Sequence, residues 1–305
     1  MSRAVLVSLA LAACHAPGPS PQVPEAACAA ALPELAAQHT RNVTRIYLAT
    51  FAVESGGVAI GAPELLTGKP GYVNQPAFTE DGAGLYFTWR PEGGQADIWY
   101  HDIATGAERP VTCTSEEEYS ATPTRDGLIV VRIAADSSRA LVRLGPGGRR
   151  DRLFPAVRDI GAYLWIDDAH VGMFFGGPDG TRLALGDPRS GAMRDVADGV
   201  TAAMAVVPGA AALGYVDQRA DPARLMRLEL ATGATAPVMT IPVSVEKFAW
   251  LPDGSVLAGA GRTVVRASAG DPTWREVGRF DGRLDGTITR VIVGQGHLAI
   301  VTRLE

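Results

Sequence analysis

The sequence contains little lysine, little cysteine and few aromatic residues. Only Lys69 and Lys247 are lysines among 28 basic residues, and 33 acidic residues give the chain a formal net charge of −5. A nucleic-acid-binding surface needs a basic stripe, so this balance argues against a nucleic-acid partner. Because alanine is abundant as well, the preference for arginine most simply reflects a GC-rich genome rather than a phosphate site.

Several catalytic and metal-binding motifs are missing too. The chain has no G-x-S-x-G, no H-E-x-x-H and no paired-cysteine motif, which argues against a serine hydrolase of that type and against a helix-borne zinc site. The histidines outside the N-terminal region, His101, His170 and His297, lie in separate segments. We therefore expect no catalytic set, no metal centre and no cofactor.

What the sequence does contain is turns. It has 35 glycines and 21 prolines, its aliphatic runs are short, and no window has the period of a long amphipathic helix, so an all-β fold is expected. Six polar turns interrupt the apolar runs at intervals of 45, 42, 40, 45 and 42 residues, which indicates a repeated unit. These turns are Asp81-Gly82, Asp126-Gly127, Asp168-Ala169, Pro208-Gly209, Asp253-Gly254 and Gln295-Gly296.

The clearest copy of the unit predicts four strands. The first is expected at Pro76–Thr79, the second at Leu85–Trp89 and the third at Asp97–Ile103. A short outer strand is expected at Arg109–Thr112, where Pro110 is tolerated because the strand has a free edge.

This copy resembles the repeat of the TolB-type β-propeller family. The matching residues are Pro76-Ala77-Phe78-Thr79-Glu80-Asp81-Gly82, then Asp97-Ile98-Trp99, then Thr105-Gly106, with Glu80 in place of the usual proline. The second-best opening is Phe248 to Gly254. The resemblance implies protein partners in the cell envelope. TolB has a second, N-terminal α/β domain, and only a tether is expected before the propeller here, so a role in the Tol system is not expected.

The two ends of the chain carry complementary half-units. The last copy has only two strands, expected at Ile288–Val293 and His297–Arg303, while Arg45–Phe51 and Val58–Thr67 match a third and fourth strand without a first and second. A ring that completes its last blade from both termini has no exposed sheet edge. We therefore predict that residues 43–305 form a six-bladed β-propeller in which the N- and C-terminal strands share one blade.

Residues 1–14 resemble a bacterial lipoprotein signal peptide. A positive start is followed by an apolar run from Ala4 to Ala13, which is too short to span a membrane, and Leu11-Ala12-Ala13-Cys14 resembles a lipobox. The resemblance implies lipid attachment at Cys14. Because residue 15 is His rather than Asp, the inner-membrane retention signal is absent and a periplasm-facing anchor in the outer membrane is expected. The alternative is an ordinary secretory signal with cleavage nearby.

Residues 15–42 are expected to form a flexible tether rich in proline and alanine, since prolines there exclude a helix or a central strand. If Cys14 carries lipid, Cys28 and Cys113 remain. In an oxidising periplasm these two thiols either form a disulfide or stay free.

The candidate binding face is the end of the ring where the loops after the second strands and the connections between blades are expected. Aromatic residues and arginine are common in recognition surfaces, and local packing is the alternative explanation for them. The run Glu116-Glu117-Glu118 between two blades is expected as a solvated loop. The candidate binding residues are Tyr72, Trp89, Arg90, Tyr119, Asp217 and Arg219.

Three functions are compatible with these patterns. The favoured hypothesis is a lipid-anchored cell-envelope propeller that binds or scaffolds an unidentified envelope protein without catalysis. Its only membrane contact would be the lipid. The alternatives are an enzyme acting on a carbohydrate or another small molecule in the central channel, and a structural lipoprotein with no ligand of its own.

Overall fold

The computed structural model describes residues 43–242 and 245–304. The predicted signal peptide and tether, with Cys14 and Cys28, lie outside the described residues. Within these residues the chain forms β-strands and one 3-10 turn, η2 (Pro146–Gly148), so the all-β prediction is confirmed. No helix in this part of the chain is long and apolar enough to cross a bilayer.

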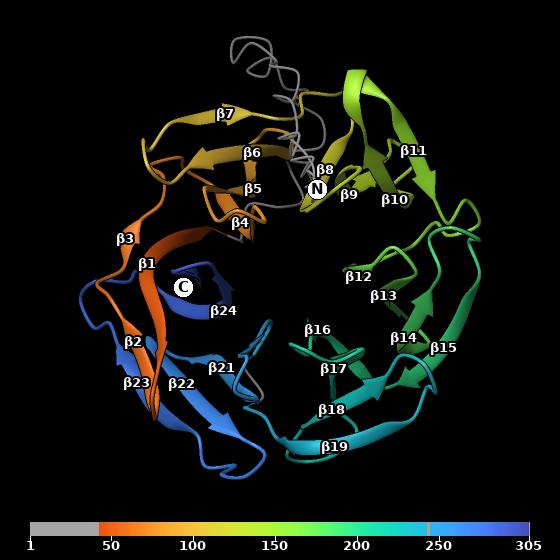
Figure 1. Cartoon of the computed structure of the whole chain (residues 1–305). Coiled ribbons are helices and arrows are strands. Elements are labelled where there is room, and N and C mark those ends of the chain that lie inside the picture. The colour runs from red at the N-terminus through yellow and green to blue at the C-terminus, as the bar shows by residue number, and fades with distance from the viewer. Residues whose placement is uncertain (1–42, 243–244, 305) are drawn as a thin grey trace, which may run out of the picture.

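In five blades four consecutive strands pair antiparallel, with the first strand of each innermost in the ring (Figure 1). A parallel pair between Thr44 and Tyr72 joins one of these blades to the strands from the chain ends in a single sheet. The second blade contains β4 (Tyr72–Phe78), β5 (Gly84–Arg90), β6 (Asp97–Asp102) and β7 (Glu108–Pro110). The third contains β8 (Glu117–Thr124), β9 (Gly127–Ile133), β10 (Arg139–Leu144) and β11 (Arg150–Leu153). The fourth contains β12 (Ala162–Asp167), β13 (His170–Gly177), β14 (Gly180–Gly186) and β15 (Met193–Asp198). The fifth contains β16 (Val200–Val206), β17 (Ala212–Asp217), β18 (Arg224–Glu229) and β19 (Thr235–Thr240). The sixth contains β20 (Ala249–Trp250), β21 (Ser255–Ala260), β22 (Thr263–Ser268) and β23 (Arg275–Arg279).

The remaining blade, the closing blade, is shared by the two ends of the chain, as predicted. Its inner strands are β24 (Thr287–Gly294) and β25 (His297–Arg303), and its outer strands are β1 (Thr44–Glu54) and β2 (Gly57–Ile60), with the short β3 (Glu64–Leu65) beside β1. The antiparallel register joins Thr44 to Arg303 and Thr50 to His297. The protein is therefore a six-bladed β-propeller closed by strands from both termini (Figure 1).

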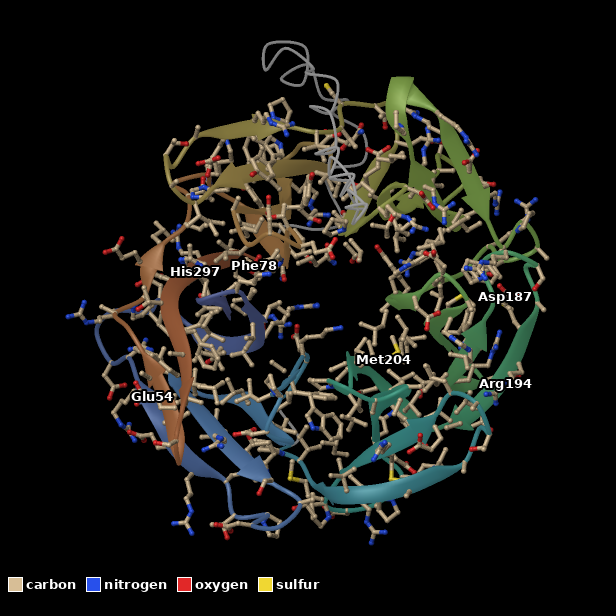
Figure 2. The ribbon with its side chains drawn as sticks, in the orientation of Figure 1. Glu54, Phe78, Asp187, Arg194, Met204 and His297 are labelled. Carbon is tan, nitrogen blue, oxygen red and sulfur yellow. The ribbon has the colours of Figure 1, made fainter. Side chains whose placement is uncertain are left out.

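The hydrophobic core is divided into layers between neighbouring blades. Ile46, Phe87 and Ala299 are each fully buried and belong to the layer between the closing blade and the second blade. At the edge of this layer the rings of Phe78 and His297 stack with centroids 6.4 Å apart (Figure 2). Because every layer needs strands from two blades, no blade buries its apolar surfaces alone.

The first strand of the second blade is longer than predicted. It begins at Tyr72 rather than Pro76, because Gln75 adopts a positive φ of 58° and a register shift between Asn74 and Ala77 lets the strand continue past Pro76. Such a bulge accommodates a proline that a regular ladder would not. The third blade repeats the feature at Ser120, where φ is 55°.

The ring has two distinct faces because every blade repeats the same strand order. One face, called here the hairpin face, carries the turns between first and second strands; Gly82 and Gly296 have a φ of 70° there, as the predicted turns require. The opposite face, called here the crossover face, carries the starts of the innermost strands and the loops between second and third strands.

Candidate functional site on the crossover face

Three of the predicted binding residues meet on the crossover face. The rings of Tyr72 and Tyr119 lie edge to face with centroids 6.2 Å apart, and the Arg90 guanidinium lies 5.6 Å from the Tyr72 centroid. Arg90 Nη1 donates to the Tyr119 hydroxyl over 3.3 Å, and that hydroxyl donates to Glu117 Oε2 over 3.1 Å. All three side chains are partly exposed. We call Tyr72, Arg90 and Tyr119 the tyrosine–arginine cluster.

The location of these residues was predicted incorrectly in one respect. Tyr72 and Tyr119 are not in connections between blades but lie in the innermost strands β4 and β8, and Arg90 is the last residue of β5 rather than part of a loop. The bulges at Gln75 and Ser120 extend these two strands up to the crossover face. The cluster therefore rests on strands of two blades.

Trp89 does not join the cluster. It is also a β5 residue rather than a loop residue. Its Nε1 donates to the Pro70 carbonyl over 2.9 Å, and its ring packs edge to face on Trp99 at 5.1 Å. Lys69 Nζ lies 4.6 Å from the Trp89 centroid and 3.8 Å from the Trp99 centroid, and it pairs with Glu108 over 3.5 Å. These contacts assign Trp89 to packing within the second blade.

Asp217 and Arg219 form a local ion pair in the fifth blade. Arg219 Nη2 and Nε approach the two Asp217 oxygens at 2.7 and 3.0 Å, and Arg219 holds the pKa of Asp217 below its ordinary value. Asp217 is the last residue of β17, and Arg219 follows it in a loop. The structure does not bring this pair to the tyrosine–arginine cluster.

A group of basic residues on the same face was not predicted. Lys247 lies just before β20 and is paired in parallel with Arg290 of β24, while Glu246 forms ion pairs with Arg290, over 3.6 Å, and with Arg303. Burial raises the pKa of the Tyr72 phenol, and the nearby charges of Arg290, Arg90 and Arg303 oppose that rise. Tyr72 therefore links the tyrosine–arginine cluster to this basic group.

One sequence signal could have drawn attention to Lys247, although it was not used in the prediction. It is one of two lysines in the chain, and it stands just before the opening of a repeat, much as Tyr72 stands before Pro76. Nothing in the spacing along the chain connects Lys247 with Arg290, because they belong to different blades.

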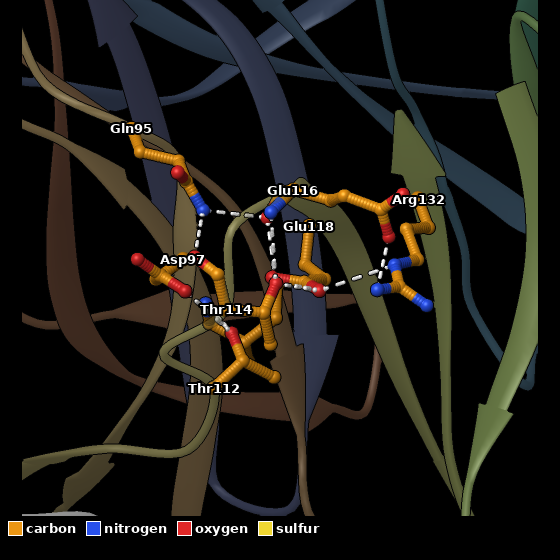
Figure 3. Close-up of polar contacts among 8 residues, drawn as sticks. Gln95, Asp97, Thr112, Thr114, Glu116, Glu118 and Arg132 are labelled. Atoms are coloured by element: carbon orange, nitrogen blue, oxygen red, sulfur yellow. Dashed lines mark hydrogen bonds and ion pairs between the residues drawn. The ribbon is translucent and has the colours of Figure 1, made fainter. Parts of the chain in front are cut away.

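The acidic run is partly buried, so its interpretation as a solvated loop was wrong. Glu117 and Glu118 open strand β8, and the Glu118 side chain is 1% exposed. Thr114 Oγ1 donates to Glu118 Oε1 over 2.6 Å, and Arg132 lies against both Glu116 and Glu118 (Figure 3). The buried position exists because β8 of the third blade packs against β6 of the second blade.

Glu118 faces a second buried carboxyl group, that of Asp97. Burial raises the pKa of Glu118 to about 7 and that of Asp97 to about 6, and the Asp97 charge adds to the rise at Glu118. Thr112 Oγ1 donates to Asp97 Oδ1 over 3.1 Å, whereas Glu118 Oε2 is buried without a hydrogen-bond partner among the described residues. Because burial and the neighbouring charge both disfavour two ionised carboxylates here, the protonated form of each is favoured up to a higher pH than in water.

The histidines do not converge. His101 is buried beside Glu108, with Nδ1 and Oε1 3.2 Å apart, His170 contacts Asp167, and His297 contacts the Gln295 carbonyl. Within residues 43–242 and 245–304 there is no group of three or more His, Cys, Asp or Glu side chains able to hold a metal ion.

Cys113 is a partly exposed thiol, and because Cys28 lies outside the described residues, their disulfide stays a prediction.

Comparison with known proteins supports the fold. No protein-family model and no curated protein matches the sequence. Among solved structures, TolB from Acinetobacter baumannii is similar with a TM-score of 0.56 at 10% identity, over 85% of this chain and 63% of that chain. The chain therefore spans less than two thirds of that TolB. A chain of the nidogen/laminin complex gives 0.60 at 9% identity, over 86% of this chain and 98% of its own. A gluconolactonase from Xanthomonas campestris gives 0.59 at 12% identity, over 84% and 94%. At such identities the similarity establishes the propeller fold and nothing finer.

Proposed function

We propose that this chain is a lipid-anchored cell-envelope propeller that binds a protein partner through its crossover face, without catalysing a reaction. The observation that carries the proposal is the tyrosine–arginine cluster. Tyrosine and arginine are the residue types that dominate binding energy at protein interfaces, and here three such side chains are held partly exposed by strands of two blades. Rigid strands hold such a surface in place before binding, which lowers the entropy lost on association.

The envelope location in this proposal rests on the N-terminal sequence. The lipobox-like segment Leu11-Ala12-Ala13-Cys14 supports a lipid anchor, and His15 supports the outer membrane, facing the periplasm. The structural similarity to TolB is compatible with an envelope protein.

Partner binding is tested by recovery of bound protein from detergent-solubilised envelope. We expect Tyr119→Ala to lower the recovery of a reproducible partner by roughly tenfold or more, because truncating a central aromatic anchor costs about 2 kcal/mol. Arg189→Gln, in the exposed turn between β14 and β15 and away from the crossover face, is the control and should leave the recovery unchanged. Equal recovery with Tyr119→Ala and the unmodified protein would contradict the assignment of the cluster. Thermal unfolding of each variant separates loss of binding from loss of fold.

The anchor has its own test. Cys14→Ser removes the sulfur that would carry the acyl chains, so we expect the protein to move from the membrane fraction to the soluble periplasmic fraction. Fractionation followed by immunoblotting measures this. A variant that stays with the membrane would show that lipid at Cys14 is not what holds the protein.

The alternative is an enzyme acting on a carbohydrate or another small molecule at the centre of the ring. The similarity to a gluconolactonase is the observation that favours it. Incubation with gluconolactone, with acid release followed by a pH indicator, separates the two hypotheses. Turnover above the spontaneous rate would favour the enzyme.

A further inference from the structure

The basic group on the crossover face has more positive than negative charge. Its cations are Lys247, Arg290 and Arg303, and its carboxylate is Glu246, which already pairs with both arginines. Within the described part of the chain, the only charge that acts noticeably on Lys247 is that of Arg290. Lys247 is thus the cation of this group without a carboxylate partner among the described residues.

The backbone holds Lys247 and Arg290 directly opposite each other. The two residues are partners in a parallel bridge, and the amides of Glu246 and Lys247 both donate to the Thr289 carbonyl over 3.2 Å. Like charges in opposite positions of neighbouring strands are destabilising. This register keeps two cations close although they repel each other.

Both cations are incompletely solvated. Burial lowers the pKa of Lys247 to about 7, with a further contribution from Arg290, and burial lowers the pKa of Arg290 as well. Arg290 Nε is buried and has no hydrogen-bond partner among the described residues. A buried donor without a partner is costly, and an anion placed beside the two cations would remove both the repulsion and the unsatisfied donor.

The surroundings extend the site toward the tyrosine–arginine cluster. The charges that face this position come from Arg290 on β24, Arg303 on β25, Arg90 on β5 and Glu246 beside Lys247, and the Tyr72 phenol of β4 lies among the three arginines. The site is therefore formed by residues of the second, sixth and closing blades.

We propose that Lys247 and Arg290 form a binding site for an oxyanion, a carboxylate or a phosphate group, on the crossover face of the ring. The inference does not depend on the proposed protein-binding function. The oxyanion has two sources: the acidic side chain of a peptide, or a free small anion.

The test uses the fact that the chain has only two lysines, Lys69 and Lys247. Reductive methylation with ¹³C-formaldehyde gives each lysine its own NMR signal. We expect Lys247 to titrate near pH 7 without an added anion and about one pKa unit or more higher with a bound one, because an opposite charge favours the ammonium form. Lys69, over Trp89 and Trp99, is the internal control and should not move.

Two probes distinguish the sources at constant ionic strength: inorganic phosphate and a short glutamate-rich peptide. A shift of Lys247 alone with either probe supports the site, and the probe effective at the lower concentration identifies the source. If neither probe shifts the Lys247 signal selectively at tens of millimolar, the proposal is overturned. An equal shift of both lysines would also overturn it.

Variants add an independent measurement by calorimetry with the more effective probe. Lys247→Met should weaken binding about tenfold or more, since one charge-assisted contact is lost, whereas Lys247→Arg should retain most of it. Arg283→Gln removes one positive charge from an exposed turn and should have no effect. Unchanged affinity in Lys247→Met would contradict the site. If that variant does not fold, the NMR titration of the unmodified chain still decides.

Discussion

Replacing Ala299 with aspartate should abolish or severely weaken the folded ring. Ala299 is fully buried in the layer between the closing and second blades, and in β25 it pairs with Leu48 of β1 and Ile292 of β24. An unpaired carboxylate at this position costs about 4 kcal/mol or more, which is a large part of the stability of an ordinary domain. Urea unfolding followed by tryptophan fluorescence measures the loss.

The control for this prediction is the same substitution in the same blade. Ala59 is exposed on the outer strand β2, so Ala59→Asp should change the free energy of unfolding by less than about 0.5 kcal/mol. If both variants were equally stable, β25 would not be buried between β1 and β24. The closure of the ring by the two termini would then be wrong.

The second large effect concerns pH. Glu118 and Asp97 have pKa values of about 7 and about 6 in the folded protein, against ordinary values of 4.5 and 3.8. Between about pH 4 and pH 7 the folded state therefore binds more protons than the unfolded state. By linkage, the contribution of this pair to the free energy of unfolding falls as pH rises from about 4 to about 7, and it is constant below and above that window.

Glu118→Gln should remove about half of this dependence, because the rise in the pKa of Asp97 has its own cause in burial and remains. Glutamine keeps an oxygen that accepts from Thr114 and carries no charge, so neither the burial of a charge at this position nor its repulsion with Asp97 remains. Relative to the unmodified protein, the variant should be about equally stable near pH 4 and more stable near pH 8, by on the order of 3 kcal/mol. Arg132 retains Glu116 as a partner in the variant.

Unfolding curves collected from pH 4 to pH 8 measure the difference between the two proteins. Three other charges face the pair: Glu117 raises the pKa of Asp97, while Arg132 and Arg150 lower that of Glu118. None of them is changed in the variant.

Glu92→Gln, the same change at an exposed loop position, should give a constant difference across the range. A Glu118→Gln difference that is equally constant would show that the carboxyl pair is not protonated as described.

The repeat and its closure were available from the sequence because both depend on local patterns. The strand His297–Arg303 was predicted with the bounds that it has, since a turn at Gln295-Gly296 precedes a compact apolar run. The half-units at the two ends were recognisable because each lacked the strands that the other supplied. The first strand of the second blade was placed too late, because Pro76 was taken as its start and the bulge at Gln75 has no mark in the sequence.

The candidate site depended on contacts between blades, which spacing along the chain does not record. The sequence placed Tyr72, Arg90 and Tyr119 on one face, but only the packing of β4, β5 and β8 brought them together. The position of Trp89 in the packing of its own blade could not be predicted from its place near the end of β5. Glu118 looked like part of a solvated charge run because burial depends on the neighbouring blade. Lys247 and Arg290 are opposite each other because ring closure sets β24 beside the start of the sixth blade.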